Sequence, residues 1–240
     1  MTGDIGLKVA VIIPALNKVA VIIPALNEEE AIGRVVRAIP PLASQVIVVD
    51  NGSTDRTAEK AREAGARVVR EERKGYGYAC LRGMKEAGDA DVIVFLDGDY
   101  SDFPEEMGLL VGPIAQGKAD LVIGSRIRGR RERGALPPQA FLANVLFSMA
   151  LRLLYGLRVT DIGPFRAIRA DRLFSLNMRE GTYGWTLEMM IKAARRKQRV
   201  VEVPVSYRRR IGRSKVSGSL RASLKAAARM MYTISRYIAW

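Results

Sequence analysis

Short apolar runs rich in β-branched residues alternate with stretches of helical spacing over the first half of the chain. The runs at 19–24, 45–50, 67–70, 91–97 and 120–125 predict strands, and the stretches at 29–38, 54–64, 76–87 and 105–116 predict helices. Strands that are apolar almost throughout and are separated by helices are typical of a mostly parallel sheet that is covered on both faces. The pattern therefore predicts an α/β fold.

From Pro137 onward this alternation stops. The pattern there predicts an apolar helix at 139–155, a helix that contains Trp185, a strand near 200–207 and a basic tail. Ligands of parallel α/β sheets bind at the carboxyl ends of the strands. That rule selects, as candidate ligand-binding residues, Asn27 and Glu28, Asp50 and Asn51, Asp97 to Asp99, and Ser125 with Arg126.

The segment KVAVIIPALN occurs twice in direct succession, at 8–17 and again at 18–27. This period is too short for a solenoid repeat. Only the second copy runs directly into Glu28 and a helical pattern, so we expect it to supply the native first strand. The first copy is then surplus, disordered or paired at a sheet edge, or it is an artefact of cloning or sequence assembly.

Composition narrows the partners and the chemistry. Lysine and arginine number 39 against 25 acidic residues, and the resulting net charge of +14 indicates an anionic partner such as nucleic acid, acidic lipid or a phosphorylated substrate. The chain has no histidine and one cysteine, Cys80, which exclude histidine catalysis, an internal disulfide and a cysteine-based zinc cluster. Without a signal-peptide pattern or an apolar stretch of roughly 18 residues, we expect a cytoplasmic protein that can still touch a membrane.

Two carboxylates two positions apart follow one of the predicted strands. In Asp97-Gly98-Asp99 the glycine lets a ligand approach the backbone, and such a pair suits a hard divalent ion shared with phosphate oxygens. Alone, the same tripeptide is also a common turn. Asp50 ends another strand and is a candidate acceptor for a nucleobase or ribose, whereas Ser53 is better explained by turn and capping roles.

Several motifs resemble those of the family-two inverting glycosyltransferases. They are Pro24 to Glu28, Asp50 to Asp55, Asp97-Gly98-Asp99 and Gly124-Ser125-Arg126, in matching order and spacing. Further motifs are similar to those of dolichyl- or polyprenyl-phosphate mannose and glucose synthases: Thr160-Asp161, Tyr183-Gly184-Trp185 with Glu188, Glu202-Val203-Pro204, and Arg210 to Lys215. The resemblance implies a GT-A fold, with a catalytic domain at 18–218 between a surplus segment at 1–17 and a basic amphipathic helix at 219–240.

The resemblance also implies residue roles. Pro24, Leu26, Glu28 and Asp50 would line the nucleoside pocket, and Asp97 and Asp99, with Ser101, would surround Mg²⁺ or Mn²⁺. Leucine stands at position 26, where an aromatic residue is frequent, and Asn51 replaces the second acid of the usual Asp-Asp pair. Because of these two departures the motifs do not fix the base of the donor, and both UDP-hexose and GDP-hexose remain candidates.

On the acceptor side, the resemblance implies a polyprenyl phosphate, which is already ionised and needs little help from a base. Arg126, Arg210 and Lys215 are the candidates to hold this phosphate. If the acceptor were a hydroxyl, Glu188 or Asp161 would have to take its proton, although structural roles for both remain open. A non-catalytic protein that binds membranes or nucleic acid would explain the charge but not the carboxylates at successive strand ends, so we do not expect a nucleic-acid partner.

The C-terminal end is strongly basic, because no acidic residue follows Glu202. Helical spacing puts Arg221, Lys225 and Arg229 on one stripe and apolar residues on another. Such a helix can lie in an anionic lipid interface, with Tyr237 and Trp240 as anchors, which would make the protein peripheral at the inner face of the membrane. The alternative is an ordinary amphipathic helix packed on the core, and the helix at 139–155 is open to the same two interpretations.

Overall fold

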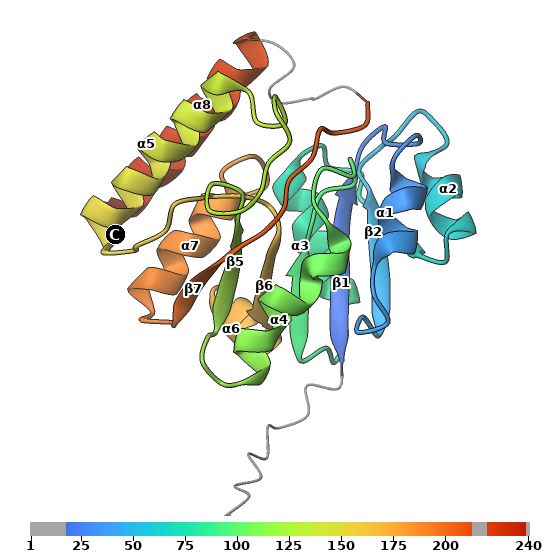
Figure 1. Cartoon of the computed structure of the whole chain (residues 1–240), viewed down its shortest axis with the longest axis horizontal. Helices are drawn as coiled ribbons and strands as arrows, with labels where there is room; N and C mark the ends of the chain where they lie inside the picture. Colours follow the sequence, from blue (N-terminus) through green and yellow to red (C-terminus); the bar gives the residue numbers. More distant parts are fainter. Residues whose placement is uncertain (1–17, 213–219, 239–240) are drawn as a thin grey trace, which may run out of the picture.

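A computed structural model describes residues 18–212 and 220–238, and these form a seven-stranded sheet with helices on both faces (Figure 1). The strand order is β3-β2-β1-β4-β6-β5-β7, and every neighbouring pair is parallel except the two that involve β6. The strands are β1 (Val19–Ala25), β2 (Gln45–Asp50), β3 (Arg67–Arg70), β4 (Val92–Phe95), β5 (Leu121–Ser125), β6 (Arg166–Arg169) and β7 (Val200–Pro204). The expected α/β fold is confirmed.

The helices divide between two hydrophobic cores, one on each face of the sheet. The face covered by α1 (Ile32–Ala38), α2 (Thr57–Glu63) and α4 (Met107–Ala115) lies opposite the face covered by α3 (Tyr76–Glu86), α6 (Ala170–Ser175) and α7 (Trp185–Arg195). A short 3₁₀ helix, η1 (Pro104–Glu106), precedes α4. Side chains of β1 alternate between the cores, so that Ile22 packs on one face and Ile23 on the other.

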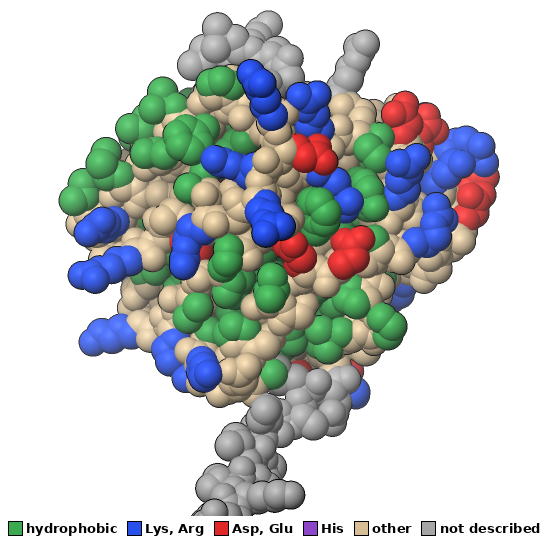
Figure 2. Space-filling view, viewed as in Figure 1, with side chains coloured by type: hydrophobic (Ala, Val, Ile, Leu, Met, Phe, Trp, Pro, Cys, Tyr) green, Lys and Arg blue, Asp and Glu red, His purple; other side chains and the backbone are tan. Residues whose placement is uncertain are grey.

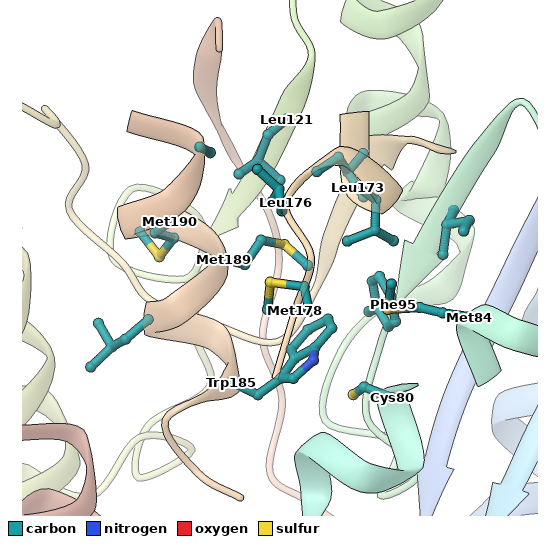
Figure 3. Packing of buried hydrophobic residues seen from close by; sticks show 14 of the residues in the cluster. Cys80, Met84, Phe95, Leu121, Leu173, Leu176, Met178, Trp185, Met189 and Met190 are labelled. Carbon is teal, nitrogen blue, oxygen red and sulfur yellow. The ribbon is translucent and has the colours of Figure 1, made fainter. Parts of the chain in front are cut away.

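The core under α7 is built around Trp185 (Figure 3). Its ring meets Phe95 of β4 edge-on, with the ring centroids 4.7 Å apart, and it is fully buried. Cys80 lies in the same core, where burial raises the pKa of its thiol. This packing fixes the first turn of α7 behind the carboxyl end of β4, which is where the candidate metal ligands lie.

Two long helices lie side by side at one edge of the molecule (Figure 1). They are α5 (Pro138–Tyr155) and α8 (Leu220–Ile238), and α8 also packs against α7. One face of α5 is exposed and apolar, and it carries Leu142, Leu146, Met149 and Leu153 among others. In the part of the chain described, no helix combines the length and the hydropathy needed to cross a bilayer.

The expected strands and helices agree with the structure to within a few residues at each end, but β6 and α6 were not predicted. β6 carries an arginine at each end of a four-residue strand, so it shows no apolar run. It is antiparallel to both neighbours and leads directly into α6. The first copy of the duplicated segment lies outside the described residues, and the second copy forms β1 as expected.

Candidate active site

The main cavity opens at the carboxyl ends of β1 and β4. From β1 the chain adds β2 and β3 on one side of that strand and then β4 on its other side, so the order of strand addition reverses at β1 and β4, which are parallel. Such a switch point is where open α/β sheets bind ligands. The cavity has a volume of about 740 Å³. Its wall includes Pro24, Leu26, Glu28, Asn51, Lys74, Asp97, Asp99, Tyr183 and Arg210.

Asp97 and Asp99 follow β4 and both line this cavity. The Oδ1 atom of Asp99 accepts hydrogen bonds from the backbone N–H of Ser101 at 2.9 Å and from its hydroxyl at 2.5 Å. These bonds orient the Asp99 carboxylate. Ser101 is buried and is not part of the cavity wall, so its expected role as a metal ligand stays a prediction.

The residues at this turn fit a divalent cation that is shared with a diphosphate. The Oδ1 atom of Asp97 is buried and has no hydrogen-bond partner within the described residues. Burial and the charges of Asp99 and Asp102 raise the pKa of Asp97, and burial together with Asp99 raises that of Asp102 to about 7. A cation would relieve this repulsion. No group of three or more acidic or thiol ligands occurs in residues 18–212 and 220–238, and Mg²⁺ is usually bound by one or two carboxylates with substrate phosphates.

Asn51, rather than Asp50, reaches the cavity wall. Asp50 is buried, and its Oδ1 accepts the N–H of Ser53 at 3.0 Å, which is the turn role expected for Ser53. The Asn51 amide donates to the carbonyls of Glu71 and Arg73 and accepts the N–H of Gly75 at 2.8 Å. It therefore fixes the 71–75 loop at the cavity, and the nucleoside role of Asp50 stays a prediction.

The glycines at the start of α3 serve close backbone packing. A Cβ atom at Gly75 would lie 2.2 Å from the carbonyl oxygen of Gly181, and one at Gly77 would lie 2.1 Å from that of Glu180. Gly75 also has a φ of 152°, which side-chain-bearing residues rarely adopt. The N–H of Tyr78 donates to the Gly181 carbonyl at 3.0 Å. The start of α3 thus docks the 180–181 loop.

A second cavity, of about 510 Å³, adjoins the first and extends between α5 and α8. Much of its wall is apolar, with Leu136, Ala140, Phe147, Ala227 and Met230 among its residues, and Arg126, Arg209 and Arg210 lie on the same wall. Both cavities are lined by Tyr76, Asp97, Asp99, Tyr183 and Arg210. The candidate metal ligands therefore lie at the junction of the two cavities.

Of the three expected phosphate-binding cations, Arg210 lies at this junction and Arg126 on the wall of the second cavity, and both already have acidic partners. Arg126 forms a bidentate pair with Asp161, with bonds of 2.9 Å from Nε and 2.7 Å from Nη2. Arg210 contacts both Glu28, at 2.8 Å, and Asp99, at 3.0 Å. Lys215 lies outside the described residues.

Asp161 and Glu188 have structural contacts and line neither cavity. Burial alone would raise the pKa of Asp161, but the charge and hydrogen bonds of Arg126 hold it below its usual range. Glu188 is fully buried, accepts the N–H groups of Arg179 and Glu180, and accepts the Tyr237 hydroxyl at 2.6 Å. The structure therefore supports the structural alternative for both carboxylates over the role of base.

Arg208 contacts the turn that follows β4. Its Nε donates to the Tyr100 carbonyl at 2.7 Å and its Nη2 to the Asp102 carbonyl at 3.1 Å. Its guanidinium also lies over the rings of Tyr100 and Phe103. Arg208 thus holds the turn that carries the candidate metal ligands, a role that no motif of the sequence indicated.

Helix α8 closes one side of the first cavity. Arg229 lines that cavity and forms a bidentate pair with Glu180, with bonds of 3.0 Å and 2.9 Å. Tyr237 is buried against Glu188. The expectation that Tyr237 anchors the helix in lipid is therefore wrong, and Trp240 lies outside the described residues.

Comparison with known proteins agrees with this geometry. The sequence model described as Glycosyl transferase family 2 matches residues 20–173. An uncharacterized glycosyltransferase of Mycobacterium tuberculosis is 40% identical over 94% of this chain and 96% of its own length. The undecaprenyl-phosphate mannosyltransferase of Micrococcus luteus is 34% identical over 89% of each chain.

A solved structure gives the same indication for the fold. Glucosyl-3-phosphoglycerate synthase from Mycobacterium tuberculosis, in complex with Mn²⁺, uridine-diphosphate-glucose and phosphoglyceric acid, matches with a TM-score of 0.76 and 27% identity. The match covers 93% of this chain and 80% of that one. The GT-A fold implied by the sequence motifs is confirmed.

Proposed function

Since the chain belongs to glycosyl transferase family 2, we propose that it is a metal-dependent hexosyltransferase that uses a polyprenyl or dolichyl phosphate as acceptor. The donor is UDP- or GDP-hexose, mannose or glucose being the sugar, and the anomeric carbon is inverted. The observation that carries this proposal is the shared wall of the two cavities, where Asp97, Asp99 and Arg210 stand between a cavity at the carboxyl ends of the strands and one that extends between α5 and α8.

The first cavity suits the donor. Pro24, Leu26 and Asn51 offer a surface for the nucleoside, and Asp97 and Asp99 on the same wall would hold the metal that binds the diphosphate. A bound Mg²⁺ or Mn²⁺ supplies charge neutralisation for the leaving nucleoside diphosphate. The similar M. tuberculosis synthase was solved in complex with both Mn²⁺ and uridine-diphosphate-glucose, which supports this arrangement.

The second cavity suits an acceptor with an anionic head and an apolar chain. Arginines on its wall can hold a phosphate, while the surfaces of α5 and α8 are apolar enough for a prenyl chain. A phosphate oxygen is already ionised at neutral pH, so it can attack the anomeric carbon directly on the face opposite the leaving diphosphate. No carboxylate has to act as base, consistent with the buried, paired states of Asp161 and Glu188.

The alternative is a transferase with a hydroxyl on a small acceptor. It is favoured by the fold match to glucosyl-3-phosphoglycerate synthase, which was solved in complex with phosphoglyceric acid. Such an acceptor would leave the apolar part of the second cavity without a partner. The undecaprenyl-phosphate mannosyltransferase similarity favours the lipid phosphate instead.

A lipid acceptor requires access from a membrane, and we propose that α5 provides it. Its outer face is exposed and apolar, with Leu153 exposed to 75%. In Figure 2 hydrophobic side chains gather on the side of the molecule where Figure 1 shows α5. The inner face of the same helix lines the second cavity through Ala140 and Phe147. The protein would then be peripheral at the inner, anionic surface of the membrane.

The test is sugar transfer from UDP- and GDP-hexoses to farnesyl phosphate, with farnesol and phosphoglycerate as alternative acceptors, with and without Mn²⁺. Asp99→Asn should abolish Mn²⁺-dependent transfer, because it removes half of the carboxylate pair. Transfer to farnesyl phosphate alone supports the proposal. Equal transfer to farnesol would favour the hydroxyl-acceptor alternative, and donor affinity that does not depend on Mn²⁺ or on Asp99 would contradict the metal assignment.

A further inference from the structure

Arg210 is the one cation that joins the acidic groups of the first cavity to the wall of the second, within residues 18–212 and 220–238. Its Nη1 lies 3.0 Å from Oδ2 of Asp99, and its Nη2 lies 2.8 Å from Oε1 of Glu28. The Nε atom is buried and has no hydrogen-bond partner among the described residues. The guanidinium thus occupies the side of Asp99 that a cation would need.

The backbone next to Arg210 is fastened to the same turn. The N–H of Ile211 donates to the Asp99 carbonyl at 2.9 Å, and the N–H of Arg208 donates to the Ser101 carbonyl at 3.0 Å. These bonds hold the chain on both sides of Arg210 while its side chain remains partly exposed, at 25%. Consequently the guanidinium can exchange partners by rotation of the side chain, while the backbone on both sides of Arg210 stays in place.

Asp99 has one oxygen available for such an exchange. Its Oδ1 is occupied by the two hydrogen bonds from Ser101, so Oδ2 is shared between Arg210 and any incoming cation. A divalent ion at Oδ2 would face the positive guanidinium at close range, and the two like charges would repel. Arg210 would then move away from Asp99, and the second cavity can receive the guanidinium because Arg210 already lines it.

We propose that Arg210 is the resting counter-ion of the metal site and that a divalent cation displaces it toward the acceptor phosphate. The proposal rests on the proposed function, since it takes the first cavity as the metal site and the second as the acceptor site. Before the metal binds, Arg210 is held by Glu28 and Asp99. Once the metal has bound, the same guanidinium can bind an anion in the second cavity, so the metal prepares the acceptor site.

Coupling of this kind is reciprocal. If Mn²⁺ strengthens binding of the acceptor phosphate through Arg210, the phosphate must strengthen Mn²⁺ binding by the same factor. The competition also predicts the effect of removing the side chain. Arg210→Ala frees Asp99 for the metal, and it abolishes the coupling between the two sites.

The first experiment measures Mn²⁺ binding to the full chain by electron paramagnetic resonance, with neither donor nor acceptor present. We expect Arg210→Ala to bind Mn²⁺ about fivefold more tightly than wild type, whereas Arg210→Lys, which keeps the charge, should not show this gain. Arg169→Ala is the matched control, because Arg169 is a partly exposed arginine that pairs with Asp171 and lies beside Val92, at the end of β4 opposite to Asp97 and Asp99. Mn²⁺ affinity in Arg210→Ala equal to or weaker than in Arg169→Ala would overturn the proposal.

The second experiment measures farnesyl phosphate binding by calorimetry with and without Mn²⁺. Wild type should bind it about fivefold more tightly with the metal, and Arg210→Ala should show no such difference. Mn²⁺ can also bind farnesyl phosphate directly in solution. This effect is the same for wild type and Arg210→Ala, so it cancels when the two proteins are compared. If the coupling persists in Arg210→Ala, the role of Arg210 is contradicted and the proposed function is not affected. If no variant binds Mn²⁺, even with UDP present, the proposed function is contradicted as well.

Discussion

Arg208 lies over two aromatic rings, with its guanidinium carbon 3.5 Å from the Tyr100 ring centroid and 3.9 Å from that of Phe103. It also donates to two carbonyls of the turn that carries Asp99. Tyr100 has a φ of 63°, so this turn includes a conformation that is unfavourable for a residue with a side chain. Arg208 therefore supports a backbone that would otherwise relax.

Replacing Arg208 should impair the site although the side chain does not reach the cavities. Arg208→Ala removes two hydrogen bonds to carbonyls and the stacking, so we expect transfer to fall by about 10- to 100-fold, equivalent to about 1.5–3 kcal/mol. Arg208→Lys should rescue little, because lysine lacks the planar fork. The measurement is kcat/KM with thermal unfolding, beside Arg34→Ala on the exposed side of α1 as control. If Arg208→Ala kept full activity, Arg208 would have no role in supporting the site.

Asp120 provides a pH-dependent contribution to stability. Hydrogen bonds from the Arg199 side chain lower the pKa of Asp120 to about 2, below its usual value of 3.8. A carboxylate whose pKa is lowered by folding stabilises the protein above its unfolded pKa, and this contribution disappears as the pH falls toward 2. Because Arg199 is half exposed, solvent screening reduces the effect to about 1 kcal/mol.

We therefore expect Asp120→Asn to lower the free energy of unfolding by about 1 kcal/mol at pH 7 and by progressively less between pH 4 and pH 2. Urea unfolding of the variant and the wild type across this range measures the difference. Asp89→Asn is the control, because Asp89 pairs with Lys18 on the surface with 79% of its side chain exposed. A stability difference that stayed constant with pH would rule out this origin.

At the scale of elements, α8 shows what an amphipathic pattern leaves open. Its spacing predicted two faces correctly, but not which partner the apolar face would meet. The structure packs it on α5 and α7, with Tyr237 bonded to Glu188 and Arg229 bonded to Glu180. These partners lie about 50 residues away in sequence, so only tertiary packing brings them together.

The bond between Tyr237 and Glu188 should stabilise α8 on the core. Tyr237→Phe leaves a buried carboxylate with one donor fewer, and we expect a loss of about 1–3 kcal/mol in the free energy of unfolding. Tyr232→Phe is the matched control, since Tyr232 lies on the same helix and is 52% exposed. Thermal unfolding of both variants tests this, and equal stability of the two would show that the hydroxyl contributes nothing.

The duplicated segment makes a prediction about β1. This strand lies between β2 and β4 and pairs with both, so its central position is filled by residues 19–25. Deletion of residues 8–17 should therefore leave folding and transfer unchanged. Circular dichroism and the transfer assay on the shortened chain check this, and loss of the folded state would assign a structural role to the first copy.

The sequence predicted those elements whose apolar pattern reports local burial, and it predicted the positions of ligands at strand ends. Asp97 and Asp99 could be found because they directly follow a buried strand. β6 could not be found in this way. Its Arg166 is fully buried in the core and donates hydrogen bonds to the carbonyls of Gly163 and Thr186, whereas an arginine in a sequence normally indicates an exposed position. The role of Arg208 could not be predicted either, because its hydrogen-bond partners are backbone atoms more than 100 residues away.

At the scale of the whole molecule, the outer face of α5 determines how a lipid acceptor would reach the site. Five of its residues form a continuous apolar stripe: Leu142, Val145, Leu146, Met149 and Leu153, all exposed. Basic residues adjoin this stripe, since Arg131 lies over the Phe141 ring and Arg152 is exposed on the same helix. An apolar stripe with basic neighbours is suited to an anionic bilayer, which rewards both burial of leucine and contact with arginine.

We expect the wild type to sediment with vesicles that contain phosphatidylglycerol, and the double variant Leu146→Gln, Leu153→Gln to bind them at least about tenfold more weakly. Leu109→Gln is the matched control, because Leu109 is 49% exposed on α4, on the other face of the sheet. Transfer to farnesyl phosphate in solution should survive in the double variant, since its cavity-lining residues are unchanged, whereas transfer to undecaprenyl phosphate in vesicles should fall with binding. If Leu109→Gln lost vesicle binding equally, or if the double variant kept it, α5 would not be the membrane surface.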